Sequence, residues 1–384
     1  MFYLKIKVLF LILFFCTFSE INAQMNKKFL SVDKIALKIP DSLTTSSKDI
    51  ADYINTLALS DENKLRVIYI WITRNIQYDT EKKYSFGQDS TEIIAKTLNS
   101  REGVCTNYAE LYSNIANKVG VKSNIIQGYT IQNGQVDYNP HSWCVSIIDS
   151  SWYIFDPTWG SGFIQNSKFI PHIDDNYFKM SPDRAIKTHM PFDPLWQLLN
   201  YPISNPEFCN KDMDLKNENI LFNFNDALKI YEKQSDIERL ISKRERIANN
   251  GINSFLIFTI IQQLDAQITN YYLENSYRKY DLALHVYKEG IYMLNRFIEH
   301  RNDYFLPNNG DLYLKQKLDD IENSFAESMV NLESIDKPNL KLERSIGQLY
   351  KSIYAIMENV NEHRLFLDKF MKTPKKDRMS LFYD

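Results

Sequence analysis

The C-terminal half of the chain has the clearest hydrophobic pattern, because its apolar residues recur every three or four positions. This period places them on one face of a helix. Residues 336–339 contain a proline and separate two such stripes, so we predict an antiparallel helical hairpin there. The two stripes are Leu342, Ile346, Leu349, Ile353, Ile356 and Val360 and, before them, Leu314, Leu318, Ile321 and Phe325.

Two further helices are predicted upstream of that hairpin. One covers 281–300, and the other carries the stripe of Ile252, Leu256, Ile260, Leu264 and Ile268. Apolar stripes of this kind usually pack into a core. We therefore predict an all-helical domain over 220–384, in which the pattern indicates architecture and not chemistry.

The N-terminal half begins with helical periods. Ser60 is a favourable cap for one helix, and a second helix is predicted to start at Val104 or Cys105 and to end at Gly120. The apolar residues of these two helices are Leu65, Ile68, Ile72 and Ile76 in the first, and Tyr108, Leu111, Ile115 and Val119 in the second.

Strand-like segments follow the second helix. They cover 122–129, 141–148 and 152–155, and in the second of them apolar and polar residues alternate. A short turn joins the last two. Helices followed by an antiparallel meander give an α+β arrangement, which is the fold class that we predict for this half.

The composition changes near residue 210. All five tryptophans precede residue 207, and six prolines fall within 171–206, which predicts an extended arm that covers a surface or links two domains. The predicted organisation is a signal peptide over 1–23, a domain with its arm over 24–206, a linker over 207–219, and the helical domain.

The charge balance excludes one large class of partner. Lys and Arg number 45 against 48 Asp and Glu, which gives a formal net charge of -3 and no basic excess for nucleic acid. The chain is 44% hydrophobic with only 11 Gly and 12 Pro, so it is neither collagen-like nor of low complexity. Four cysteines are too few for a dense disulfide framework.

The first residues resemble an export signal. Lys5 and Lys7 precede an apolar run over 8–15, and small and polar residues then lead to Ala23, after which we predict cleavage. The run is about half of the roughly 20 residues that a membrane span needs, and no later stretch reaches that length. A lipid-modified Cys16 is the less favoured alternative. The mature chain is therefore predicted to be periplasmic or extracellular, without a membrane span.

Three residues in the N-terminal half suggest nucleophilic catalysis. Cys105 follows Gly103 at a predicted helix start, where free backbone N–H groups and the helix dipole stabilise a thiolate. His141 is predicted to open one strand, and Asp156 closes the next strand of the same hairpin. A thiol, an imidazole and a carboxylate in this order match a nucleophile, its general base and the residue that orients the base.

Four motifs surround these residues: Trp71-Ile-Thr-Arg-Asn-Ile-Gln-Tyr78-Asp79, Gly103-Val-Cys105-Thr-Asn-Tyr108-Ala109, His141-Ser-Trp143 and Trp152-Tyr-Ile-Phe-Asp156-Pro-Thr-Trp159. Together they resemble the core of the transglutaminase-like superfamily, in particular its bacterial and kyphoscoliosis-peptidase-type members. The resemblance covers residues 45–165, less than half of the chain.

The resemblance implies a papain-like core in which the cysteine-bearing helix packs on an antiparallel sheet. It also implies a role for each residue of the site: Cys105 is the nucleophile, His141 the general base and acid, and Asp156 the residue that orients His141. The expected activity is attack on a protein or peptide amide through a thioester, as a protease or amidase rather than a cross-linker. No cofactor is expected.

One position departs from the family pattern. Three residues after the histidine the family frequently has asparagine, and this chain has Cys144. Because successive residues of a strand point to opposite faces, Cys144 should face away from His141. It is either a core thiol or the disulfide partner of Cys209. A bridge from Cys105 to Cys144 would abolish the site.

Several secondary expectations complete the site. The oxyanion would bind the Cys105 backbone N–H and one side-chain donor, for which Gln88 is a weak candidate. Trp71 is expected in the core, while Trp143 and Trp159 either wall the groove or belong to the scaffold. The remaining histidines have no metal-ligand spacing, so no metal is expected. These are His172, His189, His285, His300 and His363.

The alternative function is a scaffold without catalysis. In that reading the domain presents a peptide-binding cleft, and the helical half docks a protein of the cell envelope. The complete set of Cys105, His141 and Asp156 favours the enzyme, because a degenerate relative would be expected to have lost one of them.

Overall fold

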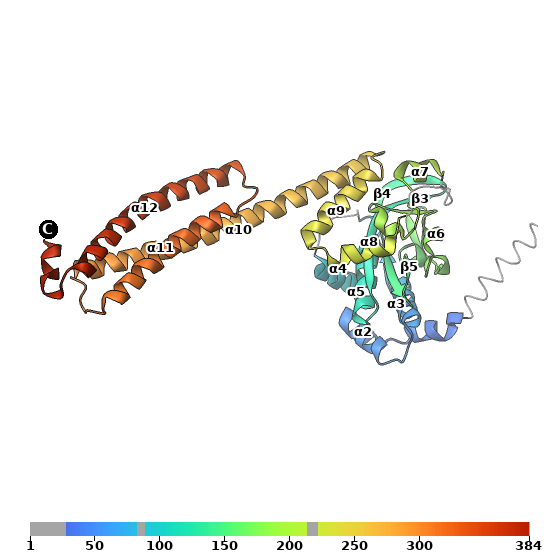
Figure 1. Cartoon of the computed structure of the whole chain (residues 1–384). Coiled ribbons are helices and arrows are strands. Elements are labelled where there is room, and N and C mark those ends of the chain that lie inside the picture. The colour runs from blue at the N-terminus through green and yellow to red at the C-terminus, as the bar shows by residue number, and fades with distance from the viewer. Residues whose placement is uncertain (1–27, 83–88, 213–221, 384) are drawn as a thin grey trace, which may run out of the picture. The chain divides into compact units, whose positions relative to one another are not determined.

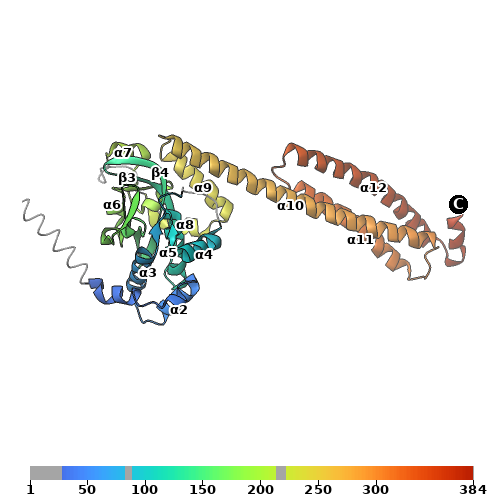
Figure 2. The ribbon, with the colours of Figure 1, turned by 180° about the vertical axis from the view of Figure 1, so that it is seen from behind.

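The structure is a computed structural model, and it describes residues 28–82, 89–212 and 222–383. The predicted signal peptide and Gln88 lie outside these residues. The chain forms two compact units, Met1–Ile261 and Gln262–Asp384. Figures 1 and 2 show the chain from opposite sides.

A four-stranded sheet is the centre of the first unit. Its strands are β3 (Ser123–Gln132), β4 (Gln135–Ile148), β5 (Ser151–Phe155) and β8 (His189–Pro191), in the order β5-β4-β3-β8. All neighbours are antiparallel. The predicted meander and the α+β class are therefore confirmed, and a fourth strand is supplied by the proline-rich arm.

The prediction that a strand starts at His141 is wrong, because β4 begins six residues earlier, at Gln135. The register explains the difference: Gly128 pairs with His141 and Thr130 with Asp137, so the ladder shifts between them. Pro140 lies in this irregular stretch. A proline lacks the N–H that a regular ladder requires, and a bulge accommodates it.

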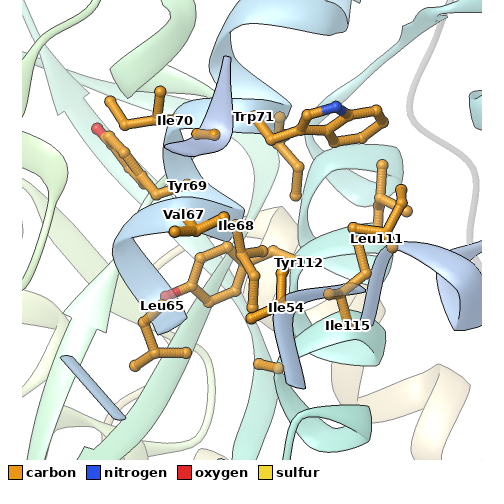
Figure 3. Packing of buried hydrophobic residues seen from close by; sticks show 14 of the residues in the cluster. Ile54, Leu65, Val67, Ile68, Tyr69, Ile70, Trp71, Leu111, Tyr112 and Ile115 are labelled. Carbon is orange, nitrogen blue, oxygen red and sulfur yellow. The ribbon is translucent and has the colours of Figure 1, made fainter. Parts of the chain in front are cut away.

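Helices cover one face of the sheet. They are α2 (Ser47–Asn55), α3 (Asp61–Asn75), α4 (Ser90–Ser100) and α5 (Cys105–Lys118). Ser60 caps α3 as predicted, since its hydroxyl accepts a hydrogen bond from the Asn63 N–H. Helix α5 packs on β3 and β4, and α2, α3 and α4 pack on α5. Figure 3 shows this core, with Ile68 and Trp71 of α3 and Leu111, Tyr112 and Ile115 of α5.

The other face of the sheet is covered by the arm and by the next helices. Trp143 and Val145 of β4 pack there against Leu195 and Leu198 of the arm and against Leu228. Leu228 belongs to α8 (Phe224–Lys233), and α9 (Asp236–Asn249) follows it in the same unit. The unit thus includes two helices that lie beyond the predicted linker at 207–219.

The arm also reaches both edges of the sheet. Its strand β8 pairs with β3, where His189 lies opposite Thr130. At the opposite edge, Met180 forms an isolated antiparallel bridge with Ile154 of β5, and both backbone hydrogen bonds of the bridge are made. The remaining arm elements are short: η3 (Asp175–Tyr177), α6 (Pro182–Ala185), η4 (Pro194–Gln197) and α7 (Asn205–Asn210).

Two small sheets flank the main one. Strand β1 (Gln77–Tyr78) pairs in parallel with β2 (Glu102–Gly103), and β6 (Gly162–Gln165) forms a hairpin with β7 (Lys168–Pro171). Strand β2 ends two residues before Cys105. Short turns η1 (Asp41–Leu43) and η2 (Trp159–Ser161) complete the unit.

The second unit is helical. The predicted hairpin is α11 (Asp311–Glu333) and α12 (Leu340–Lys372), which lie side by side in both views, and η5 (Lys375–Phe382) follows. The two helices predicted upstream are one continuous helix, α10 (Phe255–Asn302), which starts in the first unit. Within the described residues, no helix is long and apolar enough to cross a membrane.

A buried arginine ties distant segments of the first unit together. Arg66 of α3 is 1% exposed; its Nε and Nη2 donate to the two carboxylate oxygens of Asp33 at 2.7 and 2.8 Å. Its Nη1 donates to Asp175 at 2.6 Å. The guanidinium also lies over the rings of Phe29 and Phe178. Two carboxylates would lose their partner if this charge were removed.

We therefore expect Arg66→Met to lower the free energy of unfolding by about 1.5 to 3 kcal/mol, the scale of hydrogen bonds to charged groups, because Asp33 and Asp175 each keep 20% of their side chain exposed to water. Urea unfolding followed by circular dichroism measures it. Lys48→Ala is the control, because Lys48 pairs with Asp52 on the exposed surface and should leave the midpoint unchanged. Equal effects of the two substitutions would contradict a role for the buried pair.

Candidate active site

Cys105 is the first residue of α5 and is 3% exposed. The prediction that it lies at a helix start is confirmed. The N–H groups of the first turn have no hydrogen-bond partners within the helix, and the positive end of the helix dipole lies at the same place. A thiolate at this position is therefore better stabilised than one in the middle of a helix.

Asn107 fixes the start of α5. Its Oδ1 accepts the Val104 N–H at 3.0 Å, and its Nδ2 donates to Thr97 Oγ1 of α4 at 2.7 Å. Gly103 leaves room for this side chain, because a Cβ at position 103 would lie 2.4 Å from the Asn107 Cβ. The glycine before the nucleophile thus has a steric function: it lets the cap seat the helix against α4.

His141 and Asp156 form a buried pair. His141 Nε2 donates to Asp156 Oδ2 at 2.8 Å, and the two residues are 8% and 0% exposed. His141 belongs to β4, and Asp156 follows the last residue of β5, so the hairpin brings them together as the sequence predicted. The Cys105 sulphur is close enough to His141 to raise the pKa of the imidazole. Since Nε2 is directed at Asp156, Nδ1 is the nitrogen free for the sulphur.

The Asp156 carboxylate accepts four hydrogen bonds. Oδ1 accepts the backbone N–H groups of Thr158 and Trp159 at 2.9 and 3.1 Å. Oδ2 accepts His141 and also Nε2 of His189, at 3.1 Å. Four donors offset much of the cost of burying an ionised carboxylate.

These contacts move the pKa values of the pair in opposite directions. Burial alone would lower the pKa of His141, but the Asp156 carboxylate and then the Cys105 sulphur outweigh burial and raise it to about 10. Burial would raise the pKa of Asp156, but His141 and His189 outweigh it and hold that pKa well below its ordinary value. At neutral pH the site therefore contains an imidazolium beside an ionised carboxylate.

His189 is the residue that the sequence reasoning missed. It lies on β8 in the proline-rich arm, is 2% exposed, and contacts Asp156 on the oxygen that also binds His141. Tyr78 also interacts with the Cys105 sulphur. Burial and then this interaction raise the pKa of Tyr78 to about 12, so its hydroxyl is protonated at neutral pH. For His189, the only local signal is a histidine among prolines.

The other cysteines take no part in the site. Cys144 is buried in the core, and its thiol donates to the Ala109 carbonyl at 3.3 Å. Cys209 lies beside the Tyr138 hydroxyl and accepts from Asn253. The three cysteines within the described residues are free thiols, so of the two predicted alternatives Cys144 is the core thiol, and Cys105 is unbridged.

Tryptophans surround the histidines. Trp143 and Trp159 lie with their ring centres 5.9 and 5.5 Å from that of His141, and Trp143 is itself 1% exposed. Trp143 is therefore scaffold, while the half-buried Trp159 reaches solvent. Trp71 lies in the core as expected, at 3% exposure.

Among the described residues, His141, Asp156 and His189 place metal-binding atoms within 4.8 Å of one another. The sequence spacing gave no sign of this group. Both imidazoles, however, direct Nε2 at the same Asp156 oxygen, so an ion would have to replace two hydrogen bonds. The hydrogen-bond network is sufficient to explain why these groups lie together.

Comparison with known proteins shows which proteins this part of the chain is similar to. A family model described as the transglutaminase-like superfamily matches residues 48–157. The kyphoscoliosis peptidase of Mus musculus is 32% identical over 164 residues, which cover 40% of this chain and 24% of that protein. The human protein of the same name is 30% identical over 188 residues, covering 45% and 28%. The match thus spans about a quarter of the length of these relatives.

A solved structure with a similar segment is the periplasmic domain of TgpA from Pseudomonas aeruginosa. It is 17% identical, with a TM-score of 0.26, and the match covers 34% of this chain and 47% of that one.

The raised pKa of His141 predicts a pH-dependent stability. A group whose pKa is higher in the folded state stabilises the fold fully below its unfolded pKa, and that contribution disappears as pH rises through the folded value. The free energy of unfolding should therefore fall between about pH 6.5 and about pH 10. Urea unfolding across this interval should show a shallower decline for His141→Gln than for the wild type. Identical slopes would contradict the assignment of the imidazolium to His141.

Proposed function

Residues 48–157 form a transglutaminase-like domain, and from this premise we propose that the chain is an exported cysteine enzyme that attacks protein or peptide amides. Cys105 is the nucleophile, His141 the general base and acid, and Asp156 the residue that orients His141. The reaction is hydrolysis in preference to cross-linking.

The observation that carries the proposal is the electrostatics of His141. An imidazolium that lies near Cys105 and hydrogen-bonds to a buried carboxylate favours the thiolate form of the cysteine. The start of α5 adds the helix dipole at the same atom. Both effects act on the sulphur, and a thiolate is the nucleophilic form of cysteine.

The mechanism follows from this charge arrangement. The Cys105 thiolate attacks the carbonyl carbon of an amide, and the oxyanion is stabilised by the Cys105 backbone N–H. The His141 imidazolium donates its Nδ1 proton to the leaving amine, which departs and leaves a thioester. Neutral His141 then accepts a proton from water as the water attacks the thioester, and the acid product and the free thiolate are released.

Thiol ionisation tests the first step. In a Cys209→Ser background only Cys105 and the buried Cys144 remain in the chain that follows the predicted cleavage site. We expect iodoacetamide to alkylate Cys105 at neutral pH much faster than it alkylates a free cysteine, and His141→Ala to slow the reaction toward the free-cysteine rate. Alkylation followed by mass spectrometry over a pH series gives the rates. An alkylation rate equal to that of free cysteine that does not respond to His141→Ala would sink the catalytic assignment.

One assay distinguishes hydrolysis from cross-linking. The mature protein is incubated with casein and a labelled primary amine, and peptide release and amine incorporation are measured together. We expect peptide release to exceed incorporation, and Cys105→Ala to abolish both while Cys209→Ser retains them. Incorporation in excess of release would mean that an amine, rather than water, resolves the thioester.

A scaffold is the second candidate, and the low exposure of Cys105 is the observation that favours it. In that case the first unit would bind a peptide without cleaving it, and the helical unit would hold a protein of the envelope. A wild type that releases no peptide and incorporates no amine, and that is indistinguishable from Cys105→Ala, would support this second reading.

A further inference from the structure

His189 is the second imidazole on the Asp156 carboxylate. Its Nε2 lies 3.1 Å from Asp156 Oδ2, the oxygen that accepts His141 Nε2 at 2.8 Å. Its Nδ1 lies 2.8 Å from the Thr188 hydroxyl. Trp143 and Trp159 enclose the ring, with centres 5.1 and 4.6 Å away. Both ring nitrogens therefore have a partner in a nearly dry environment.

These contacts fix the protonation of His189. A carboxylate oxygen only accepts, so Nε2 must carry the proton, and Nδ1 of the neutral ring accepts the Thr188 O–H. Burial lowers the pKa of His189 and the neighbouring His141 imidazolium acts in the same direction, which together outweigh the attraction of Asp156. Of the two imidazoles, His141 carries the positive charge and His189 stays neutral.

We propose that His189 is a positioning residue of the active site: its Nε2–H anchors Asp156 Oδ2 at the point where that oxygen also receives His141. The inference rests on the proposed function, because it assigns His189 a part in the same site. His189 itself contacts neither Cys105 nor a reacting atom; it acts through Asp156.

The anchoring has a physical reason. Oδ1 is held by two backbone N–H groups that belong to the turn after Asp156 itself, whereas Oδ2 is held only by side chains. Without His189, Oδ2 would rest on His141 alone, and the carboxylate would be less well stabilised in its ionised form. His141 would then lose part of the interaction that keeps it an imidazolium, and Cys105 would lose part of its ionisation.

The other titratable groups that interact electrostatically with Asp156 do not compensate. Burial raises the pKa of each of them, so all are neutral near pH 7. They are Tyr69, Tyr78, Tyr108 and Tyr177, together with the Cys144 thiol. The charge on Asp156 is therefore balanced by His141 and its stabilisation depends on hydrogen bonds, of which His189 supplies one.

Two substitutions distinguish the effect of the His189–Asp156 hydrogen bond from the effect of the volume of the His189 ring. His189→Leu fills the site without a donor, and His189→Gln keeps an N–H that can reach Oδ2. In the Cys209→Ser background, we expect His189→Leu to lower the rate of Cys105 alkylation at neutral pH by about tenfold, the scale of one lost hydrogen bond to a charge. His189→Gln should restore the wild-type value. His363→Gln is the matched control, because His363 is a buried histidine of the second unit.

The outcomes distinguish this inference from the proposed function. If His141→Ala shifts the alkylation profile and His189→Leu leaves it at the wild-type position, the inference is overturned while the enzyme stands. If His141→Ala has no effect either, the proposed function itself fails.

A measurement on the wild type covers the case in which His189→Leu does not fold. Long-range 1H–15N NMR spectra report which nitrogen of each histidine is protonated. His189 should be neutral with the proton on Nε2 throughout the pH range of activity. A proton on Nδ1, or a charged His189 at neutral pH, would overturn the inference.

Discussion

An ionised carboxylate with no exposure to solvent is the constraint that shapes the first unit. Asp156 is tolerable in the interior only because donors from three separate segments converge on it: the turn that follows β5, strand β4 and strand β8. Each of those segments is placed by apolar packing on one of the two faces of the sheet. The core therefore holds in place the donors that keep Asp156 ionised. The hydrogen bonds to Asp156 in turn require these segments to be closely aligned.

Much of the fold and of the candidate site could be predicted from the sequence, because short stretches of residues determine those features. A serine before acidic residues marks the start of α3, and the residue order around Cys105, His141 and Asp156 brings the last two together through a short hairpin. Parity along the strand placed Cys144 on the core side. His189 could not be predicted in this way, because a three-residue strand has no period and its pairing with β3 is non-local.

Helix α10 shows a different limit. Its apolar stripe stops near Ile268 and resumes after residue 281, so the pattern indicated two helices, whereas the backbone is helical throughout. Most side chains over 269–280 are exposed or half-buried. An apolar stripe shows which face of a helix packs against the rest of the protein. A helical segment that packs against nothing needs no such stripe. The absence of proline in this stretch, which permits the continuous helix, was the more informative signal.

The arm that joins both edges of the sheet also bears on where the first unit can be cut. The segment matched by the family ends at residue 157, before Met180 and before β8. A fragment limited to that segment would leave β3 and β5 with open rows of backbone donors and acceptors. Bare edges of this kind recruit strands from other molecules, and natural sheets avoid them by covering the edge. In this protein β8 and Met180 cover the two edges, and Pro191 at the end of β8 and Pro182 shortly after Met180 have no N–H with which to extend a ladder.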